Sequence, residues 1–401
     1  MSYYVNYFQY LSSSNPVSPL FAIVVFLTAL LVAYILNKIK PSKEFQKYRS
    51  LDGLRGLAAV FVFMHHSSIW YFYKQSNIWA VPPSKLYTQL GQGAVTMFFM
   101  ITAFLFWGKI RQSSSIDWIK LYSSRVMRLA PLYYFSVFIL VIFAVVMSKG
   151  EIYNAPSLED CLHYFLFSLG GQPNLFSVKN IGLFNAYVTW TLAYEWFFYL
   201  SLPVFFIATR KPQLSRIFYY LIIPLWVVFV FYMHRYFFVA RYLIIFVLGI
   251  AAYEIYNLKK FKSIKLLAAG TPGSLIVVIS SALIVFNFNT AYDDYAPFLY
   301  FLIFIIIALG NNMYGLLTSG PARKLGEISY SVYLLQGFIL YIAFDLLTPG
   351  KETPLHHWAV DLLAVVSLII ISQVTFHLIE YRLMKKAEDL SNKIKSLVRI
   401  S

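Results

Sequence analysis

The chain has 401 residues, of which 59% are hydrophobic and only 12% are charged. Because soluble proteins carry about 25% charged residues, this composition excludes an ordinary soluble domain and indicates an integral membrane protein. The formal net charge of +16 comes from short basic runs between apolar segments, which is a pattern of membrane topology rather than of nucleic-acid binding. The single cysteine, Cys161, excludes an internal disulfide and offers no metal-site pattern.

The apolar segments predict an all-α polytopic membrane helix bundle with about eleven transmembrane helices. The segment at 160–170 is also apolar but too short to span, so we expect it to lie at the interface or to re-enter. In chain order the predicted spans are roughly residues 18–37, 52–73, 91–108, 129–148, 190–208, 216–233, 240–257, 267–287, 296–313, 327–347 and 358–381.

The distribution of lysine and arginine predicts the orientation of these spans. One side of the bundle holds 26 of the 33 basic residues and the other side holds 7. Because cytoplasmic loops carry the excess of basic residues, we expect a multi-pass protein of the inner or plasma membrane, with its N-terminus outside and its C-terminus in the cytoplasm. The longest extramembrane segment, 149–189, then lies outside, and we expect the tail from Arg382 to Ser401 to form a basic amphipathic helix at the inner surface.

Arg55 and His66 are ionisable residues within one predicted span, eleven positions apart. Such residues are costly in a bilayer, and they are usually functional. At ~100° and 1.5 Å per residue, eleven steps return to nearly the same helix face and cover ~16 Å, about half of the hydrocarbon thickness. We therefore expect Arg55 at the cytoplasmic edge and His66 near the midplane above it.

Two further motifs place charged residues at span ends. Arg125 and Arg128 are three apart at the predicted cytoplasmic edge. With Arg55 they could form a cationic mouth that grips the phosphates of a cytosolic ligand, or they could be anchors that snorkel to the interface. Glu195 lies five residues inside a span entered from the outer face, where a carboxylate is either functional or satisfied by a neighbouring side chain.

Small and polar residues elsewhere favour helix packing. Gly91 and Gly93 permit the close approach of a neighbouring helix, and Tyr330, Tyr333 and Gln336 recur at helical spacing. We interpret the last three as polar contacts between helices.

In this order the motifs resemble those of the acyltransferase-3 family of membrane acyltransferases, and the resemblance covers about residues 48–385. The family has a Leu-Asp-Gly-Leu-Arg-like string followed by a histidine, two arginines three apart followed by Leu-x-Pro, a Trp-Ser-Leu…Glu…Phe-Tyr-Leu segment and a late Ser-Tyr-x-x-Tyr-Leu segment. Here these are Leu51 to Arg55 with His66, Arg125 to Pro131, Trp190 to Leu200 and Ser329 to Leu334.

The chain departs from the family pattern at several positions. Members often have Ser-Gly-Phe-Leu where this chain has Thr102 to Leu105, and Glu-Arg-Pro where it has Glu380 to Arg382. Many have a histidine where this chain has Gln336, so the chemical role of that position does not carry over.

The resemblance implies a ten-helix acyltransferase core at 48–385, preceded by an extra helix and linker at 1–47 and followed by a basic cytoplasmic tail at 386–401. It implies transfer of an acyl group, most simply acetyl from cytosolic acetyl-CoA, to a hydroxyl of a cell-envelope saccharide such as lipopolysaccharide or exopolysaccharide. Arg55, Arg125 and Arg128 would then bind the CoA phosphates, with no metal required. His66 would be the general base or a transient acyl carrier, and Glu195 would orient it or bind the acceptor.

Two alternatives remain open from the residues. The chain could be a secondary transporter of an anionic solute with His66 and Glu195 as a proton relay, although no internal repeat supports this. It could also be a member of the same family that uses a succinyl donor or a small-molecule acceptor. The expected partners are acyl-CoA, the acceptor and the lipid bilayer, without nucleic acid, and the sequence indicates no oligomeric state.

Overall fold

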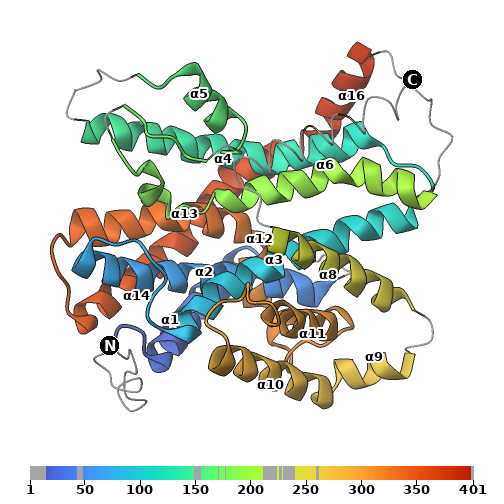
Figure 1. Cartoon of the computed structure of the whole chain (residues 1–401), viewed down its shortest axis with the longest axis horizontal. Helices are drawn as coiled ribbons and strands as arrows, with labels where there is room; N and C mark the ends of the chain where they lie inside the picture. Colours follow the sequence, from blue (N-terminus) through green and yellow to red (C-terminus); the bar gives the residue numbers. More distant parts are fainter. Residues whose placement is uncertain are drawn as a thin grey trace. The chain divides into compact units, whose positions relative to one another are not determined.

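A computed structural model of the chain confirms the predicted all-α class (Figure 1). The fold is 79% helical, and no strand occurs among the residues that the structure describes. These are residues 15–42, 48–148, 155–169, 171–176, 178–210, 240–258 and 262–398, with Pro224 and Val228.

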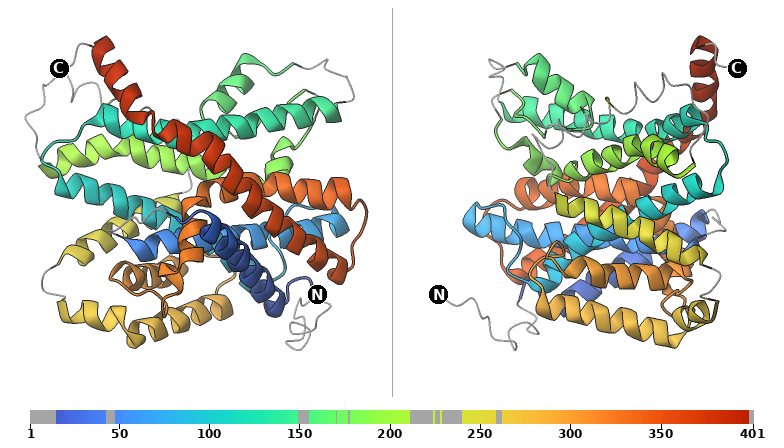
Figure 2. Two further views of the ribbon diagram at one scale, coloured as in Figure 1. Left: turned by 180° about the vertical axis from the view of Figure 1, so that it is seen from behind. Right: turned by 45° about the vertical axis from the view of Figure 1, so that its right-hand side comes forward.

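The chain divides into two compact units, Met1–Ile101 with Glu254–Gln373, and Thr102–Tyr253 with Val374–Ser401. The first unit holds α1 (Pro19–Ile39), α2 (Arg49–Ser76), the first part of α3 (Lys85–Gln112), α9 (Lys262–Ala269), α10 (Thr271–Asn287), α11 (Ala296–Ala308), η4 (Leu316–Thr318), α12 (Gly320–Glu327), α13 (Ser329–Tyr341), η5 (Ile342–Leu347) and most of α14 (Pro354–Thr375). The second holds the rest of α3, α4 (Trp118–Met147), α5 (Leu158–Phe165), η2 (Ile181–Asn185), α6 (Trp190–Arg210), most of α8 (Ala240–Asn257), η6 (Phe376–Glu380), α15 (Tyr381–Met384) and α16 (Ala387–Val398). Figure 2 shows α14 continuing through η6 into α15.

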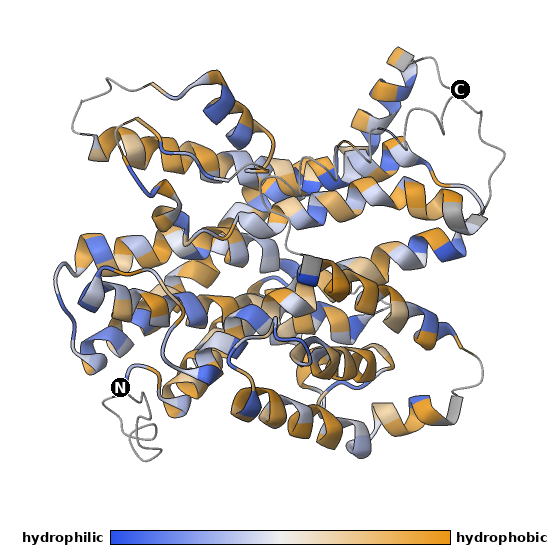
Figure 3. Cartoon of the chain, in the orientation of Figure 1, coloured by the Kyte–Doolittle hydropathy of each residue, from blue (hydrophilic) through white to orange (hydrophobic). Residues whose placement is uncertain are grey.

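Most of the predicted spans coincide with helices. Six of the helices searched are long and apolar enough to cross a membrane, and they begin at residues 19, 85, 118, 190, 329 and 354. The predicted spans at 267–287 and 296–313 correspond to the shorter apolar helices α10 and α11, which are predominantly hydrophobic in Figure 3. Apart from Pro224 and Val228, the predicted span at 216–233 lies outside the described residues.

Helix α2 is held against α12 by direct backbone contact in the first unit. A Cβ atom added to Gly56 would lie 2.4 Å from the Gly326 nitrogen, and one added to Gly326 would lie 2.1 Å from the Asp52 oxygen. Because both distances are far below van der Waals contact, only glycine permits this approach. The helix that carries Arg55 and His66 therefore has a rigid support along its first turns.

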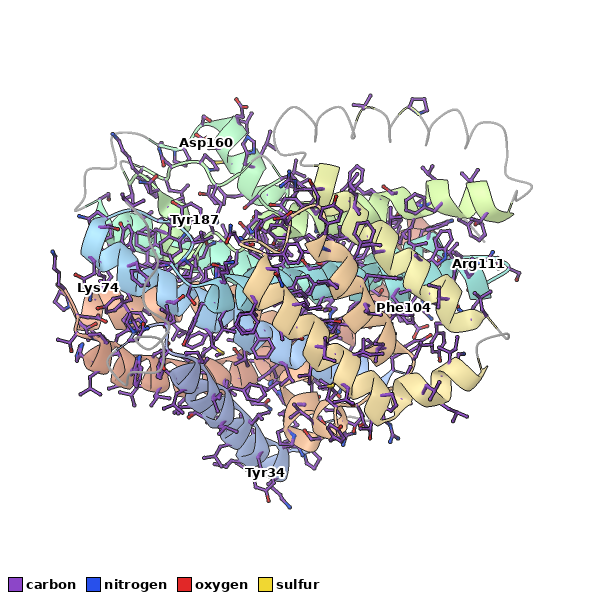
Figure 4. The ribbon with its side chains drawn as sticks, turned by 60° about the horizontal axis from the view of Figure 1, so that its bottom comes forward. Tyr34, Lys74, Phe104, Arg111, Asp160 and Tyr187 are labelled. Atoms are coloured by element: carbon purple, nitrogen blue, oxygen red, sulfur yellow. The ribbon has the colours of Figure 1, made fainter. Side chains whose placement is uncertain are left out.

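An ionic network binds the C-terminal part of α2 to the segment around Glu352. Lys74, which Figure 4 labels near that end, donates a 2.5 Å hydrogen bond to Glu352 Oε1, and the two side chains are only 6% and 3% exposed. The Thr348 hydroxyl donates to the same carboxylate at 2.9 Å. His357 Nδ1 lies 3.2 Å from Glu352 Oε2, and its Nε2 lies 3.3 Å from Ser67 Oγ. Each buried charge in this network is paired, which is the condition for burying it at tolerable cost.

In the second unit, polar contacts hold the start and the middle of α4. Asp117 caps the helix by accepting a hydrogen bond from the Lys120 backbone nitrogen at 3.0 Å, and it pairs with Lys395 of α16 at 2.5 Å. Farther along α4, the Tyr133 hydroxyl donates to the Tyr164 carbonyl of α5 at 2.8 Å. The helix that carries Arg125 and Arg128 is thus tied to the amphipathic C-terminal helix and to the segment before α6.

The Glu352 network predicts a pH-dependent stability. Burial raises the pKa of Glu352, but hydrogen bonds from His357, Lys74 and Thr348 outweigh it and hold the pKa below the ordinary 4.5. A carboxyl group of this kind stabilises the fold above its unfolded-state pKa, and the contribution is lost as the pH falls through the folded pKa. We therefore expect the thermal unfolding temperature in detergent to fall below about pH 4.5.

Glu352→Gln would leave Lys74 buried without a counter-charge, at a cost of about 3–5 kcal/mol. Its unfolding temperature should be lower at pH 7 and vary less with pH in the acidic range. Glu388→Gln, which removes a carboxylate from an exposed pair with Lys120, is the matched control. Equal unfolding temperatures for Glu352→Gln and the wild type would contradict the assignment.

Candidate functional site

Arg55 and His66 lie on the single uninterrupted helix α2, as predicted. Both side chains are half-buried, whereas Ala59 and Val62 between them on the same stripe are fully buried. Within the described part of the chain, Arg55 forms no ion pair or hydrogen bond, so its cation remains available to a ligand.

The His66 ring is held among aromatic side chains. It stacks on Trp79 with ring centroids 6.4 Å apart, and it meets the edge of His65 at 5.2 Å. Trp79 also contacts Trp70 and Tyr73, which follow His66 on the same face of α2. The buried His66 Nδ1 makes no hydrogen bond of good geometry among the residues described, although the Gln336 side chain and the Val62 backbone lie within reach of the ring.

The adjacent histidine, His65, has a structural environment instead. Its Nδ1 lies 2.9 Å from the Tyr87 carbonyl, and a Cβ atom on Gly91 would lie 2.2 Å from its ring. His65 therefore fills the space that the absent Gly91 side chain leaves on α3, which agrees with the packing role predicted for that glycine.

In the second unit, two cations converge on one aromatic ring. Arg125 Cζ lies 5.0 Å from the centroid of Phe106, and Lys109 Nζ lies 4.9 Å from it. Neither cation has an ion pair within the described ranges, and the buried Arg125 Nε has no hydrogen-bond partner there. Arg128 is half-buried one turn farther along α4. Adjacent like charges without a carboxylate partner are unfavourable until an anion binds between them.

Glu195 and Arg125 are brought together through Tyr199. The Tyr199 hydroxyl donates a short hydrogen bond to Glu195 Oε1, four residues earlier on α6, and Arg125 lies beside the same hydroxyl. The Tyr122 hydroxyl donates to the Tyr199 carbonyl at 3.0 Å, which joins α4 to α6 at this level. Glu195 is half-buried, and its carboxylate accepts a hydrogen bond from a neighbouring side chain. This is the second of the two interpretations that the sequence left open for Glu195.

The five predicted site residues therefore fall into two groups. Arg55 and His66 share α2 of the first unit, and Arg125, Arg128 and Glu195 belong to the second. The predicted pairing of His66 with Glu195 stays a prediction. No group of histidine, cysteine and acidic residues that could hold a metal ion occurs among the residues searched.

Several residues of these surroundings were not predicted from the sequence. In the sequence analysis, Lys109 entered only the count of basic residues that predicts the orientation, and Tyr199 entered only as part of a family motif. The spacing of four residues between Glu195 and Tyr199 already indicates that they are neighbours on a helix. Asp361 on α14 is 2% exposed with an unpartnered Oδ1. It lies inside a predicted span, so the rule that identified Glu195 applied to it as well.

The acyltransferase-3 family model, described as an acyltransferase domain, matches residues 48–377. The chain belongs to the acyltransferase-3 family. It is therefore an acyltransferase with membrane-spanning helices, and the matched range includes all five predicted site residues. No curated protein and no solved structure matches the chain.

Proposed function

We propose that this member of the acyltransferase-3 family is an O-acyltransferase that moves an acetyl group from cytosolic acetyl-CoA to a hydroxyl of a cell-envelope saccharide. Family membership supports acyl transfer over the transport of a solute. A succinyl donor or a small-molecule acceptor would use the same groups, and the sequence of the chain favours neither.

The observation that carries the donor assignment is the cluster of Arg125, Lys109 and Phe106. Its two cations are within 5.0 Å of one ring and lack a carboxylate partner among the described residues. Guanidinium and ammonium groups bind phosphate through charge-assisted hydrogen bonds, and CoA carries several phosphates. Together with Arg128 of the same unit, this cluster would hold the CoA end of the donor, and the binding of CoA phosphate by Arg55 stays a prediction from the sequence.

His66 would carry out the proton transfer. The acceptor hydroxyl oxygen attacks the thioester carbonyl while His66 takes the hydroxyl proton, and the C–S bond then breaks. The sulfur leaves as CoA thiolate and is reprotonated, so the products are an ester and CoA. A transient acetyl-imidazole on His66 is the alternative course of the same exchange.

The aromatic residues beside His66 support an acceptor with a flat apolar face. Trp79 is half-buried and packs on His66, Trp70 and Tyr73, so an acceptor that stacks on this indole would reach the imidazole. The segment 149–189, which we expect outside the membrane, would help to select the acceptor. Mass spectrometry of the cell envelope with and without the gene would identify the acyl group and the acceptor together.

Purified protein that receives acetyl-CoA and an extract of envelope saccharide should release CoA thiol. His66→Ala should lower this rate at least about a hundredfold, the usual contribution of a general base. His356→Ala, which removes an exposed histidine at the start of α14, should be indistinguishable from the wild type. Normal turnover by His66→Ala would refute the assigned role.

Lys109→Gln should raise the KM for acetyl-CoA about tenfold, the effect of losing one hydrogen bond to a charged group, and should leave kcat nearly unchanged. Lys120→Gln removes the same charge from an exposed position on α4 and should leave both constants unchanged. A KM for Lys109→Gln equal to that of Lys120→Gln would remove Lys109 from the donor site.

The proposed orientation can be tested with the one native cysteine. Cys161 is exposed on α5, in the segment that we place outside. A membrane-impermeant maleimide should label it in intact cells. In the matched variant Cys161→Ser with Ser396→Cys, the exposed position on α16 should be labelled only after permeabilisation. The reverse pattern would invert the topology.

A further inference from the structure

The side-chain amide of Gln336 on α13 is buried, and only its nitrogen has a hydrogen-bond partner among the described residues. The side chain is 0% exposed, and its Nε2 donates to the Tyr333 carbonyl at 3.0 Å. The Oε1 atom has no hydrogen-bond partner in the described part of the chain. A buried amide oxygen without a partner is costly, so its retention calls for an explanation.

A second buried amide in the same unit shows what a purely structural role looks like. Gln89 Nε2 donates to the Phe288 carbonyl at 3.0 Å, and its Oε1 accepts a hydrogen bond from the Tyr300 hydroxyl at 2.9 Å. Both ends of that amide are satisfied by the fold. The oxygen of Gln336 is not, so helix packing alone does not account for it.

The unmet oxygen belongs to a side chain that lies beside His66. The imidazole has an unmet atom of its own, since Nδ1 is buried and unpartnered. The ring stacks on Trp79 and contacts His65 edge-to-face, and these contacts restrict its rotation. The Gln336 amide and the His66 imidazole are thus neighbours, and each has an atom without a hydrogen bond of good geometry among the described residues.

We propose that Gln336 is a positioning residue, whose Oε1 accepts the N–H of the His66 imidazole and selects its tautomer. An amide oxygen can only accept, so the ring nitrogen facing it must carry the proton. The other nitrogen then presents its lone pair to the acceptor hydroxyl, as a base or an acyl carrier requires. This inference rests on the proposed function for its catalytic consequence but not for the hydrogen bond itself.

The hydrogen bond can be tested without any substrate. Full-length protein labelled with [15N]histidine should show one neutral tautomer for His66, with the resonance assigned by its loss in His66→Ala. Gln336→Leu removes the acceptor and should give a mixture of tautomers. Gln89→Leu, which deletes another buried amide of the same unit, should leave the His66 signal unchanged. An unchanged signal in Gln336→Leu would overturn the proposal.

Turnover provides the second readout. Gln336→Leu should lower kcat for CoA release at least about tenfold, without raising the KM for acetyl-CoA. Gln336→His should restore part of kcat, because a ring nitrogen can also accept the hydrogen bond. If Gln336→Leu acted only by destabilising the fold, Gln336→His would not restore kcat. The Gln89→Leu variant measures how far the loss of a buried amide alone lowers kcat through destabilisation.

The two claims fail separately. If the tautomer depends on Gln336 but no variant or wild-type protein releases CoA, the positioning holds and the proposed function is wrong. If His66 is required for turnover while Gln336→Leu matches the wild type in tautomer and kcat, the proposed function holds and the positioning is wrong.

Discussion

The cost of removing polar groups from water is the constraint on which this structure depends. In an apolar helix bundle, each buried charge or amide needs a partner within the fold, and the Lys74–Glu352–His357 network supplies such partners completely. His66 Nδ1, Gln336 Oε1 and Arg125 Nε lack them among the described residues. The groups that we assign to donor and acceptor thus include unsatisfied ones, whereas the Glu352 network is fully paired.

Sequence patterns predicted much of this arrangement because they depend on local periodicity and composition. Eleven steps on an α-helix are sufficient to place Arg55 and His66 on one face, and the structure has α2 unbroken over both. Contacts between distant segments were not accessible in this way. The approach of Arg125 to Phe106 depends on how α3 packs against α4, and the position of Gln336 beside His66 depends on how α13 packs against α2.

Family membership and local chemistry make separate contributions to the functional account. The first establishes acyl transfer, and the second is the basis on which we propose roles for individual residues. The basic cluster on α3 and α4 suits the phosphates of a donor, and the aromatic surroundings of His66 suit a ring-shaped acceptor. If Gln336 Oε1 accepts the His66 N–H as we propose, only the other ring nitrogen is left for proton transfer.

A comparison of two histidines tests the central claim most directly. His66 has a buried unpartnered nitrogen, whereas His357 is fully buried with Glu352 and Ser67 at its two nitrogens. The specific activity and the thermal unfolding temperature should be measured for His66→Ala and His357→Ala. We predict that His66→Ala loses turnover and keeps its unfolding temperature, and that His357→Ala unfolds at a lower temperature while its folded fraction still turns over. A reversed pattern would contradict the division between paired structural groups and unpaired reactive ones.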